Sequence, residues 1–199
     1  MAQTTILHSP TLESVIMVEK TIQKHSQECG KYQLWKKLPK KMMYQTFQVI
    51  LNYLEQSGKI MIDKDGCVIW TYDPEGIKKI LAKGVKLRWI APIYVTFGET
   101  KLEKEFELLK ESKFQNKQLY EFIDRAIKDL KNNPACGIKI PKRLWPKNYI
   151  EKYGITNLWK YNMPNAWRLI YTIKENDVMI LNVILEWFTH KEYERRFKY

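Results

Sequence analysis

Apolar positions in the first third of the chain recur with the period of amphipathic helices. The pattern predicts a first helix over residues 12–28, with Thr11 as its N-cap and Cys29-Gly30 as its stop. A short helical piece follows and ends at Pro39, since a proline disfavours helical backbone in the residue before it. Residues 41–56 form the most periodic segment, with one apolar stripe made of Met43, Phe47, Ile50, Leu51 and Leu54.

Two β-rich runs, KIMI and CVIWTY, come after the third helix. They are joined by Asp63-Lys64-Asp65-Gly66, and an Asp-Gly turn between such runs predicts a β-hairpin. Helix, short helix, helix and hairpin is the order of elements in a winged helix-turn-helix, which this part of the chain resembles. A helix over residues 74–84 closes this first domain, which we place at residues 1–86. A short and fairly stiff connection is expected within residues 84–92.

The second half of the chain starts a new pattern. IYVTF, residues 93–97, is a strand candidate, and residues 99–112 and 115–132 form two charged amphipathic helices. A loop rich in proline, lysine and aromatic residues follows, and then three strand candidates, NLWKYNM, AWRLIYTIK and VMILNVILEW. The order β-α-α-β-β-β predicts a domain over residues 90–199 in which two helices cover one face of a mostly antiparallel sheet and leave the other face free. The predicted fold class is α+β.

The composition adds a basic character that both halves share. The formal net charge of the 199 residues is +12, with +5 in residues 1–87 and +7 in residues 88–199, and the isoelectric point is near 9.4. This excess favours an acidic partner, nucleic acid first and an anionic membrane second. The longest apolar run, VMILNVILEWF, is too short and interrupted to span a bilayer, and no secretory signal opens the chain. We therefore expect a soluble, cytoplasmic protein, and we take nucleic acid rather than a membrane as its partner.

Cysteine and histidine usage predicts neither a disulfide framework nor a metal site. The three cysteines, Cys29, Cys67 and Cys136, are far apart and odd in number, which favours reduced thiols in a cytosol. His25 and Cys29 have the i, i+4 spacing of a metal-ligand pair, but no second pair accompanies them. A partly buried histidine beside a buried thiol is the favoured interpretation, and no cofactor is expected.

The exposed start of the third predicted helix carries the candidate residues of the first domain. Cationic, phenolic and amide side chains there suit the phosphates and base edges of a major groove; they are Lys40, Lys41, Tyr44, Gln45 and Gln48. Lys64 at the hairpin tip is placed to reach a phosphate or a minor groove. DNA binding is the expectation, and a packing or dimerisation module is the alternative.

The candidate chemistry of the second half lies on its last two strands. Alternation of faces along AWRLIYTIK separates Arg168 from its neighbours Trp167 and Leu169. A guanidinium in the middle of an apolar strand must reach water, an acid or a phosphate, because burying it unpaired is very costly. The last strand then runs into HKEY, which adds His190 and Tyr193.

Three segments together resemble the RelE/ParE superfamily of bacterial and archaeal toxin proteins. They are the Asn-Pro and basic loop NNPACGIKIPKRLW, the strand WRLIYTI, and the last strand running into HKEY; the resemblance covers about residues 90–199. It implies a small ribonuclease fold, whose RelE-like members cut messenger RNA on the ribosome without a metal. In that reaction a 2′-hydroxyl attacks the neighbouring phosphorus, which requires a base, an acid and cations on the phosphate. Some superfamily members act on gyrase instead, so the fold does not fix the target.

Carried over to this sequence, the resemblance puts Arg168 on the scissile phosphate and makes His190 and Tyr193 the acid and base candidates. It implies that further cations bind flanking phosphates, namely Lys139, Lys142, Arg143, Lys191 and Arg195. Each candidate has a structural alternative: the histidine as a capped strand end, the tyrosine as a packing residue, and the cations as solvated surface. The loop PKRLWPKNYIEKYGI is longer than in compact members and is placed to reshape or cover the cleft.

The first expectation is therefore a toxin–antitoxin-type protein. Its C-terminal domain would bind RNA at the ribosome, with cleavage left open. Its N-terminal domain would bind DNA or hold a partner, either a separate antitoxin or a second copy of the chain. The alternative is a non-catalytic DNA-binding transcriptional regulator whose RelE-like sheet makes protein contacts.

Overall fold

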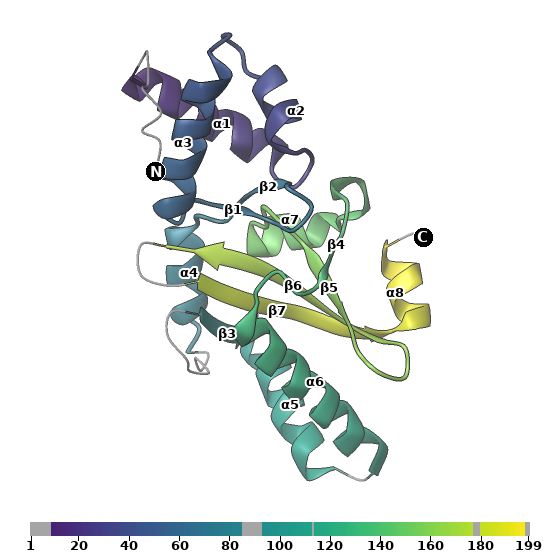
Figure 1. Cartoon of the computed structure of the whole chain (residues 1–199). Helices are drawn as coiled ribbons and strands as arrows, with labels where there is room; N and C mark the ends of the chain where they lie inside the picture. Colours follow the sequence, from purple (N-terminus) through teal and green to yellow (C-terminus); the bar gives the residue numbers. More distant parts are fainter. Residues whose placement is uncertain (1–8, 85–92, 113, 177–179, 198–199) are drawn as a thin grey trace. The chain divides into compact units, whose positions relative to one another are not determined.

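The computed structural model describes residues 9–84, 93–112, 114–176 and 180–197 (Figure 1). The chain divides into two compact units, with the boundary between Thr71 and Tyr72. Helices and strands occur in both units, which confirms the α+β class. Most of the connection expected within residues 84–92 lies outside the described residues.

The described part of the first unit consists of three helices and a hairpin. Helices α1 (Leu12–His25), α2 (Lys31–Lys36) and α3 (Tyr44–Gln56) precede strands β1 (Ile60–Ile62) and β2 (Val68–Trp70). The stripe predicted for the third helix forms its buried side, except that Met43 lies before the helix and is 45% exposed. An isolated antiparallel bridge joins Gly30, just before α2, to Cys67, just before β2.

The two ends of α1 have local causes. Helix α1 begins at the predicted cap, since Thr11 Oγ1 accepts a hydrogen bond from the Ser14 N–H at 3.2 Å. It ends at His25, earlier than predicted, because Gln27 adopts a positive φ of 66°. Ser26, directly after the helix, accepts a hydrogen bond at its Oγ from the backbone N–H of Trp70 at 2.8 Å, which ties the helix end to β2.

The turn between β1 and β2 follows from the Asp63 side chain. Its Oδ1 accepts hydrogen bonds from the backbone N–H groups of Asp65 and Cys67, both at 2.9 Å. Gly66 supplies the positive φ of 75° that this turn requires. The two strands pair antiparallel, so the predicted hairpin is confirmed.

The second unit is built on a five-stranded sheet. Its strands are β3 (Ile93–Phe97), β4 (Ile138–Lys139), β5 (Trp159–Asn162), β6 (Trp167–Glu175) and β7 (Ile180–Thr189). Their order in the sheet is β3-β7-β6-β5-β4. Strand β3 pairs with β7 in parallel, and the pairings from β7 to β4 are antiparallel. The described sheet is therefore mostly antiparallel.

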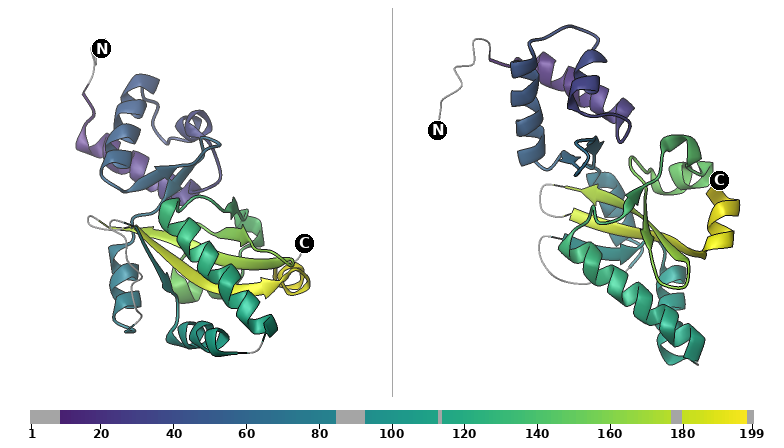
Figure 2. Two further views of the ribbon diagram at one scale, coloured as in Figure 1. Left: turned by 60° about the horizontal axis from the view of Figure 1, so that its bottom comes forward. Right: turned by 45° about the vertical axis from the view of Figure 1, so that its right-hand side comes forward.

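Helices cover both faces of this sheet (Figure 2). Helices α5 (Thr100–Glu111) and α6 (Phe114–Asn132) lie on one face, where Asn182 Nδ2 of β7 donates a hydrogen bond to the Leu130 carbonyl of α6 at 3.3 Å. Helices α4 (Pro74–Leu81), α7 (Lys147–Tyr153) and α8 (His190–Phe197) pack on the other face. They form an apolar cluster with sheet residues that include Ile170, Leu181 and Val183. The prediction that this face is free is wrong, because three short amphipathic helices bury their apolar sides on it.

The long predicted loop contains structure that the sequence pattern did not indicate. Strand β4, a 3-10 helix η1 (Lys142–Leu144) and α7 all lie within it. Helix α7 begins directly after Pro146 and ends at Gly154, whose left-handed φ of 56° is a common way for a helix to end. Tyr149 and Tyr153 of α7 point into the apolar cluster.

Helix α4 lies in the second unit, whereas the sequence pattern assigned residues 74–84 to the first. The Asp73 N–H donates a hydrogen bond to the Glu175 carbonyl at the end of β6, at 2.8 Å. Asp73 is also the N-cap of α4, since its Oδ1 accepts from the Gly76 N–H at 2.9 Å. Its Oδ2 accepts from the ammonium of Lys174, whose side chain is 3% exposed. A buried ion pair between positions 101 apart therefore fixes α4 to β6, and hydrophobic periodicity does not reveal such a contact.

Candidate functional site

Arg168 lies near the start of β6, on the sheet face that carries α4, α7 and α8. It pairs across the sheet with Asn162 of β5 and Phe188 of β7, so these three side chains share one face. The Arg168 side chain is half-buried, and its Nη1 donates a hydrogen bond to the Trp167 carbonyl at 2.9 Å. Within the residues that the structure describes, no carboxylate forms an ion pair with Arg168. Its charge is therefore neither neutralised by a described acid nor sealed in the core.

A second cation, Lys160 of β5, lies on the same face. Lys160 pairs with Ile170, two positions along β6 from Arg168. This diagonal spacing corresponds to roughly 7–8 Å in an antiparallel pair. The Lys160 Nζ lies 4.9 Å from the centroid of the Tyr193 ring, which is a cation–π geometry. The sheet register thus brings two cations close together on a partly open face.

Helix α8 begins at the end of β7 with a capping box. The N–H and Oγ1 of Thr189 donate to Glu192 Oε2 at 2.9 and 2.8 Å, and the Glu192 N–H donates back to Thr189 Oγ1 at 3.4 Å. The backbone bond from Thr189, followed by the bond from its hydroxyl, lowers the pKa of Glu192. The box explains why the sequence changes character at Thr189: a strand ends there and a helix begins.

A polar network ties α7, β7 and α8 together beside Arg168. The Tyr149 hydroxyl donates to the Glu186 carboxylate, and Arg196 Nη2 lies 3.2 and 3.4 Å from the two Glu186 oxygens. The Arg196 guanidinium also lies over the Phe188 ring, 5.6 Å from its centroid. Burial, and then the hydrogen bond to Glu186, raises the pKa of Tyr149 far above its usual value. Glu186 therefore binds Tyr149 and Arg196 and does not neutralise Arg168.

The two acid–base candidates differ sharply in exposure. His190 is the first residue of α8; its side chain is 52% exposed, and its Nε2 lies 3.4 Å from Glu194 Oε1 one turn later. Tyr193 is 2% exposed and stacks on Phe197 with ring centroids 4.6 Å apart. A ring packed beneath its own helix does not reach a substrate on the surface. We therefore withdraw Tyr193 as an acid–base candidate and keep His190.

Four of the predicted flanking cations lie on elements next to this face. Lys142 and Arg143 belong to η1, whose last residue Leu144 packs against the apolar cluster together with the following Trp145. The Lys142 Nζ lies 5.9 Å from the Trp145 ring centroid, and Arg143 is exposed. Lys191 and Arg195 are exposed on α8. These four cations lie on elements that pack on the face of Arg168, with Glu192 and Glu194 among them on α8.

The fifth predicted cation, Lys139, is on the opposite face of the sheet. It pairs with Trp159, which in turn pairs with Tyr171, so its side chain shares the face of α6. The same face carries Tyr161, whose hydroxyl donates to Asp129 of α6 at 2.5 Å. Burial first, and this hydrogen bond second, raises the pKa of Tyr161 to about 12. Lys139 is thus separated from Arg168 by the sheet and does not belong to the same cluster.

The candidate DNA-binding residues of the first unit differ in exposure and in their contacts within the protein. Gln45 and Gln48 are exposed in the first half of α3, Lys41 is exposed just before this helix, and Lys64 is exposed at the hairpin turn. Lys40 is exposed as well, but its Nζ lies 2.7 Å from Glu13 Oε1 of α1, and this hydrogen bond raises the pKa of Lys40. Tyr44 is half-buried in a cluster of aromatic rings, with its centroid 5.4 Å from that of Trp35. Lys40 and Tyr44 are therefore engaged by the protein itself.

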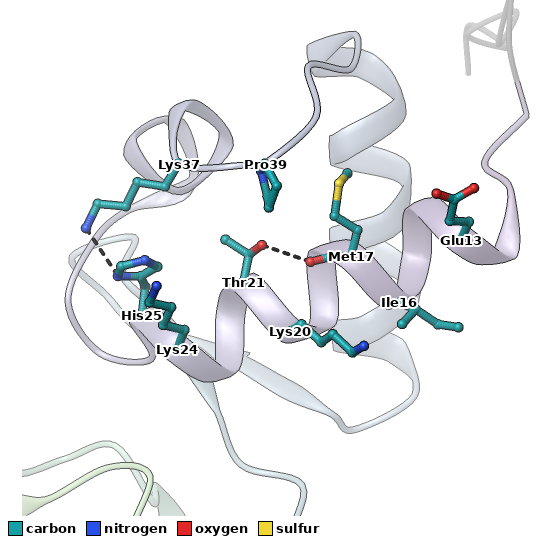
Figure 3. A pocket seen from close by; sticks show the side chains of 9 residues that line it. All are labelled: Glu13, Ile16, Met17, Lys20, Thr21, Lys24, His25, Lys37 and Pro39. Atoms are coloured by element: carbon teal, nitrogen blue, oxygen red, sulfur yellow. Dashed lines mark hydrogen bonds between the residues drawn. The ribbon is translucent and has the colours of Figure 1, made fainter.

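A groove of about 370 Å³ lies along α1 in the first unit (Figure 3). Four basic or imidazole side chains, one carboxylate and several apolar side chains line it; the lining residues are Glu13, Ile16, Met17, Lys20, Thr21, Lys24, His25, Lys37 and Pro39.

His25 Nδ1 lies 2.7 Å from Glu28 Oε2 and 3.4 Å from Lys37 Nζ, while Cys29 is buried. The partly buried histidine near a buried thiol matches the interpretation favoured from the sequence. Across the described residues, no group of three or more His, Cys, Asp or Glu side chains is arranged to hold a metal ion.

Comparison with known proteins adds no relative. No protein-family model, no curated protein and no solved structure matches the chain. None of the described helices is long and apolar enough to cross a membrane.

Two parts of this site are missing from the sequence-based prediction. Lys160 lies within the predicted strand NLWKYNM, but its place beside Arg168 depends on the register between β5 and β6, which the sequence alone does not fix. The start of α8 was readable, because Thr189-His190-Lys191-Glu192 has the S/T-x-x-E spacing of a capping box. This spacing predicts that the strand ends at Thr189 and that a helix begins at His190. In such a helix Tyr193 and Phe197 share one face, which is the face that the structure buries.

Proposed function

We propose that the second unit is a RelE-like domain that binds messenger RNA at the ribosome, and that the first unit is a winged helix that binds DNA. The order of elements along the chain supports the first part, since helices α5 and α6 lie between β3 and the antiparallel strands β4 to β7. The bridge between Gly30 and Cys67, which joins the helical part of the first unit to its hairpin, supports the second.

The observation that carries the RNA proposal is the pair of cations Arg168 and Lys160 on one sheet face. Arg168 is partly exposed and has no ion pair with any described carboxylate. A partly exposed arginine without a carboxylate partner is suited to bind an anion from outside the protein. A guanidinium can bind a phosphate with two parallel hydrogen bonds. Further cations on η1 and α8, among them the exposed Arg143, Lys191 and Arg195, are available to bind flanking phosphates.

Cleavage at this site would use His190 together with Arg168. Attack of the 2′-oxygen on phosphorus forms a cyclic 2′,3′-phosphate and breaks the bond to the 5′-oxygen. The proton of the 2′-hydroxyl leaves to a base, and the departing 5′-oxygen takes a proton from an acid. Arg168 and Lys160 would neutralise the charge that grows on the non-bridging oxygens. His190 is the one exposed acid–base group among the predicted catalytic residues, and its imidazole is suited to exchange protons near neutral pH.

A specific observation favours the non-catalytic regulator as the second candidate. Tyr193, the other predicted acid–base residue, is buried, so a two-residue acid–base mechanism lacks one member among the residues named from the sequence. In the regulator, the face of Arg168 would still bind an anion but no bond would break.

The test of RNA binding measures the affinity of the full chain for single-stranded RNA at several salt concentrations. Arg168→Ala and Lys160→Ala should each weaken binding and reduce the slope of log K against log salt by roughly 0.7. Arg125→Ala is the matched control, because Arg125 is an exposed arginine on α6, the helix on the opposite face. Equal effects of Arg168→Ala and Arg125→Ala would refute a phosphate site at Arg168.

The test of cleavage adds the full chain to translating ribosomes and maps new RNA ends that carry a 5′-hydroxyl. Arg168→Ala should slow cleavage by roughly 100-fold or more, as expected for loss of a group that stabilises the transition state. His190→Ala should slow cleavage while leaving RNA affinity unchanged. RNA binding without cleavage by the unmodified chain would select the regulator.

DNA binding by the first unit is tested with the same full chain and duplex DNA. Lys41→Ala and Lys64→Ala should weaken binding to all duplexes and lower its salt dependence. Lys101→Ala, an exposed lysine of α5 in the second unit, is the control for loss of one charge. Absence of binding at low salt would favour the packing or dimerisation module.

A further inference from the structure

Helix α3 has an outer face made of amide side chains. Gln45, Gln48, Asn52 and Gln56 are all exposed, and their spacings of i, i+3, i+7 and i+11 place them on one stripe of a helix. The buried stripe lies on the other side of the same helix. Helix α3 therefore presents a row of four carboxamides to its surroundings.

This amide face carries very little charge. Glu55 is the one charged residue within α3, and it lies in the last turn. Residues 1–71 contain nine lysines, six acidic side chains and no arginine. Along the chain, Lys41 precedes the helix, Lys59 follows it with its Nζ 2.6 Å from Glu19 Oε1, and Lys64 lies on the hairpin turn. Charge and amide groups are thus separated, with lysines beside the helix and amides along it.

Such a separation matches the two tasks of a DNA-binding helix. Lysines at the margin neutralise phosphates without reading sequence, whereas side chains along the helix meet base edges. Asn and Gln form two hydrogen bonds with adenine, at N6 and N7, whereas guanine is read mainly by Arg or Lys at O6 and N7. The outer face of α3 offers the adenine-reading group in four copies, and no cation stands on it.

We propose that α3 reads A·T base pairs in the major groove through Gln45, Gln48 and Asn52. The first two residues lie in the first half of the helix, the part that contacts base edges in helix-turn-helix proteins. Thirteen residues span about 20 Å, enough for base contacts along several base pairs. This inference rests on the proposed DNA binding of the first unit and adds the class of sequence that it selects.

The experiment selects binding sites for the full chain from a library of randomised duplex DNA. Sites enriched in A·T pairs at two or three neighbouring positions are expected. Gln48→Ala and Asn52→Ala should each reduce the preference at one position by about fivefold or more, with an unchanged salt slope. Gln48→Arg should change the preferred base at its position from adenine to guanine, a gain that a misfolded variant cannot produce. Gln23→Ala removes an exposed amide from α1 and should change nothing.

The outcomes separate this inference from the function on which it rests. Binding to duplex DNA without enrichment of A·T pairs, or with enrichment that Gln48→Ala and Asn52→Ala leave intact, overturns adenine reading and leaves DNA binding standing. No binding to any duplex at low salt overturns both, and assigns the amide row to contacts between proteins.

Discussion

Replacing Asp73 by asparagine tests whether a buried ion pair holds α4 on the sheet. Asparagine keeps a side-chain oxygen that can cap α4 at Gly76, so the change removes the charge and retains the cap. Lys174 is 3% exposed, and without Asp73 its remaining described partner is the Gly154 carbonyl at 3.4 Å. Removing one member of a buried pair costs about 3–5 kcal/mol, because an uncompensated charge stays in the core.

The reverse substitution should cost less. In Lys174→Met the Asp73 carboxylate is left without its cation, but it is 26% exposed and still accepts from the Gly76 N–H. Water then solvates the carboxylate in part, and a cost of about 1–2 kcal/mol is expected. The double variant should be more stable than the sum of the single costs predicts, because neither charge is then left alone. The two single substitutions thus differ because the two partners differ in burial.

Urea unfolding of the full chain gives the free energies, and calorimetry gives the midpoint temperatures. For a unit of this size, Asp73→Asn should lower the midpoint of its transition by roughly 10–20 °C. Lys78→Met breaks the exposed Lys78–Glu75 pair on the same helix and should leave the transition unchanged. If Asp73→Asn behaves like Lys78→Met, the ion pair does not anchor α4, and its assignment to the second unit loses its main support.

Three further predictions concern the same unit. Gly76→Ala should destabilise it although alanine favours helices, since the added Cβ would lie 2.0 Å from Asp73 Oδ2; a gain in stability would contradict this packing. The raised pKa of Tyr161, about 12, means that its contribution to stability is complete below pH 10 and is lost as pH rises toward 12. Tyr161→Phe should weaken this alkaline loss in a pH series of urea unfolding, and an unchanged profile would exclude it as a cause. Thr189→Ala should cost about 1 kcal/mol by removing the cap of α8. The hydrogen bonds from Thr189 lower the pKa of Glu192, so the ionised carboxylate stabilises α8 above the usual carboxyl pKa and this contribution is lost as pH falls through the lowered pKa. Alanine keeps the backbone N–H bond to Glu192 and removes the hydroxyl, so circular dichroism should show a smaller acid loss of helix in the variant, and an equal loss would contradict the role of the hydroxyl.

The sequence predicted the elements that short-range pattern determines. The Asp63–Gly66 turn sets the first hairpin, Thr11 caps the first helix, and the alternation along WRLIYTI put Arg168 on the face opposite Leu169. In each case the cause lies within a few residues, so it can be read directly from the chain.

What the sequence did not predict depends on contacts between distant positions. The pairing of Asp73 with Lys174 moved α4 from one unit to the other. Packing of α7 and α8 on the sheet covered the face that was expected to be free and buried Tyr193. Lys160 lies beside Arg168 because of the register between β5 and β6, which no local sequence pattern predicts. The candidate site depends on contacts between residues that are far apart in the sequence. For this reason the sequence predicted the site less completely than it predicted the individual helices and strands.

Strand β7 occupies an interior place in the sheet, although it is the last of the described strands along the chain. Ile93 of β3 pairs with Ile180, which is synthesised 87 positions later, so a nascent chain carries β3 without its partner strand for on the order of 10 s. Chaperones and proteases that recognise open edges would therefore meet this unit in every round of synthesis. A premature stop before β7 would leave Arg168 without Phe188 and without α8, so such a fragment should be degraded.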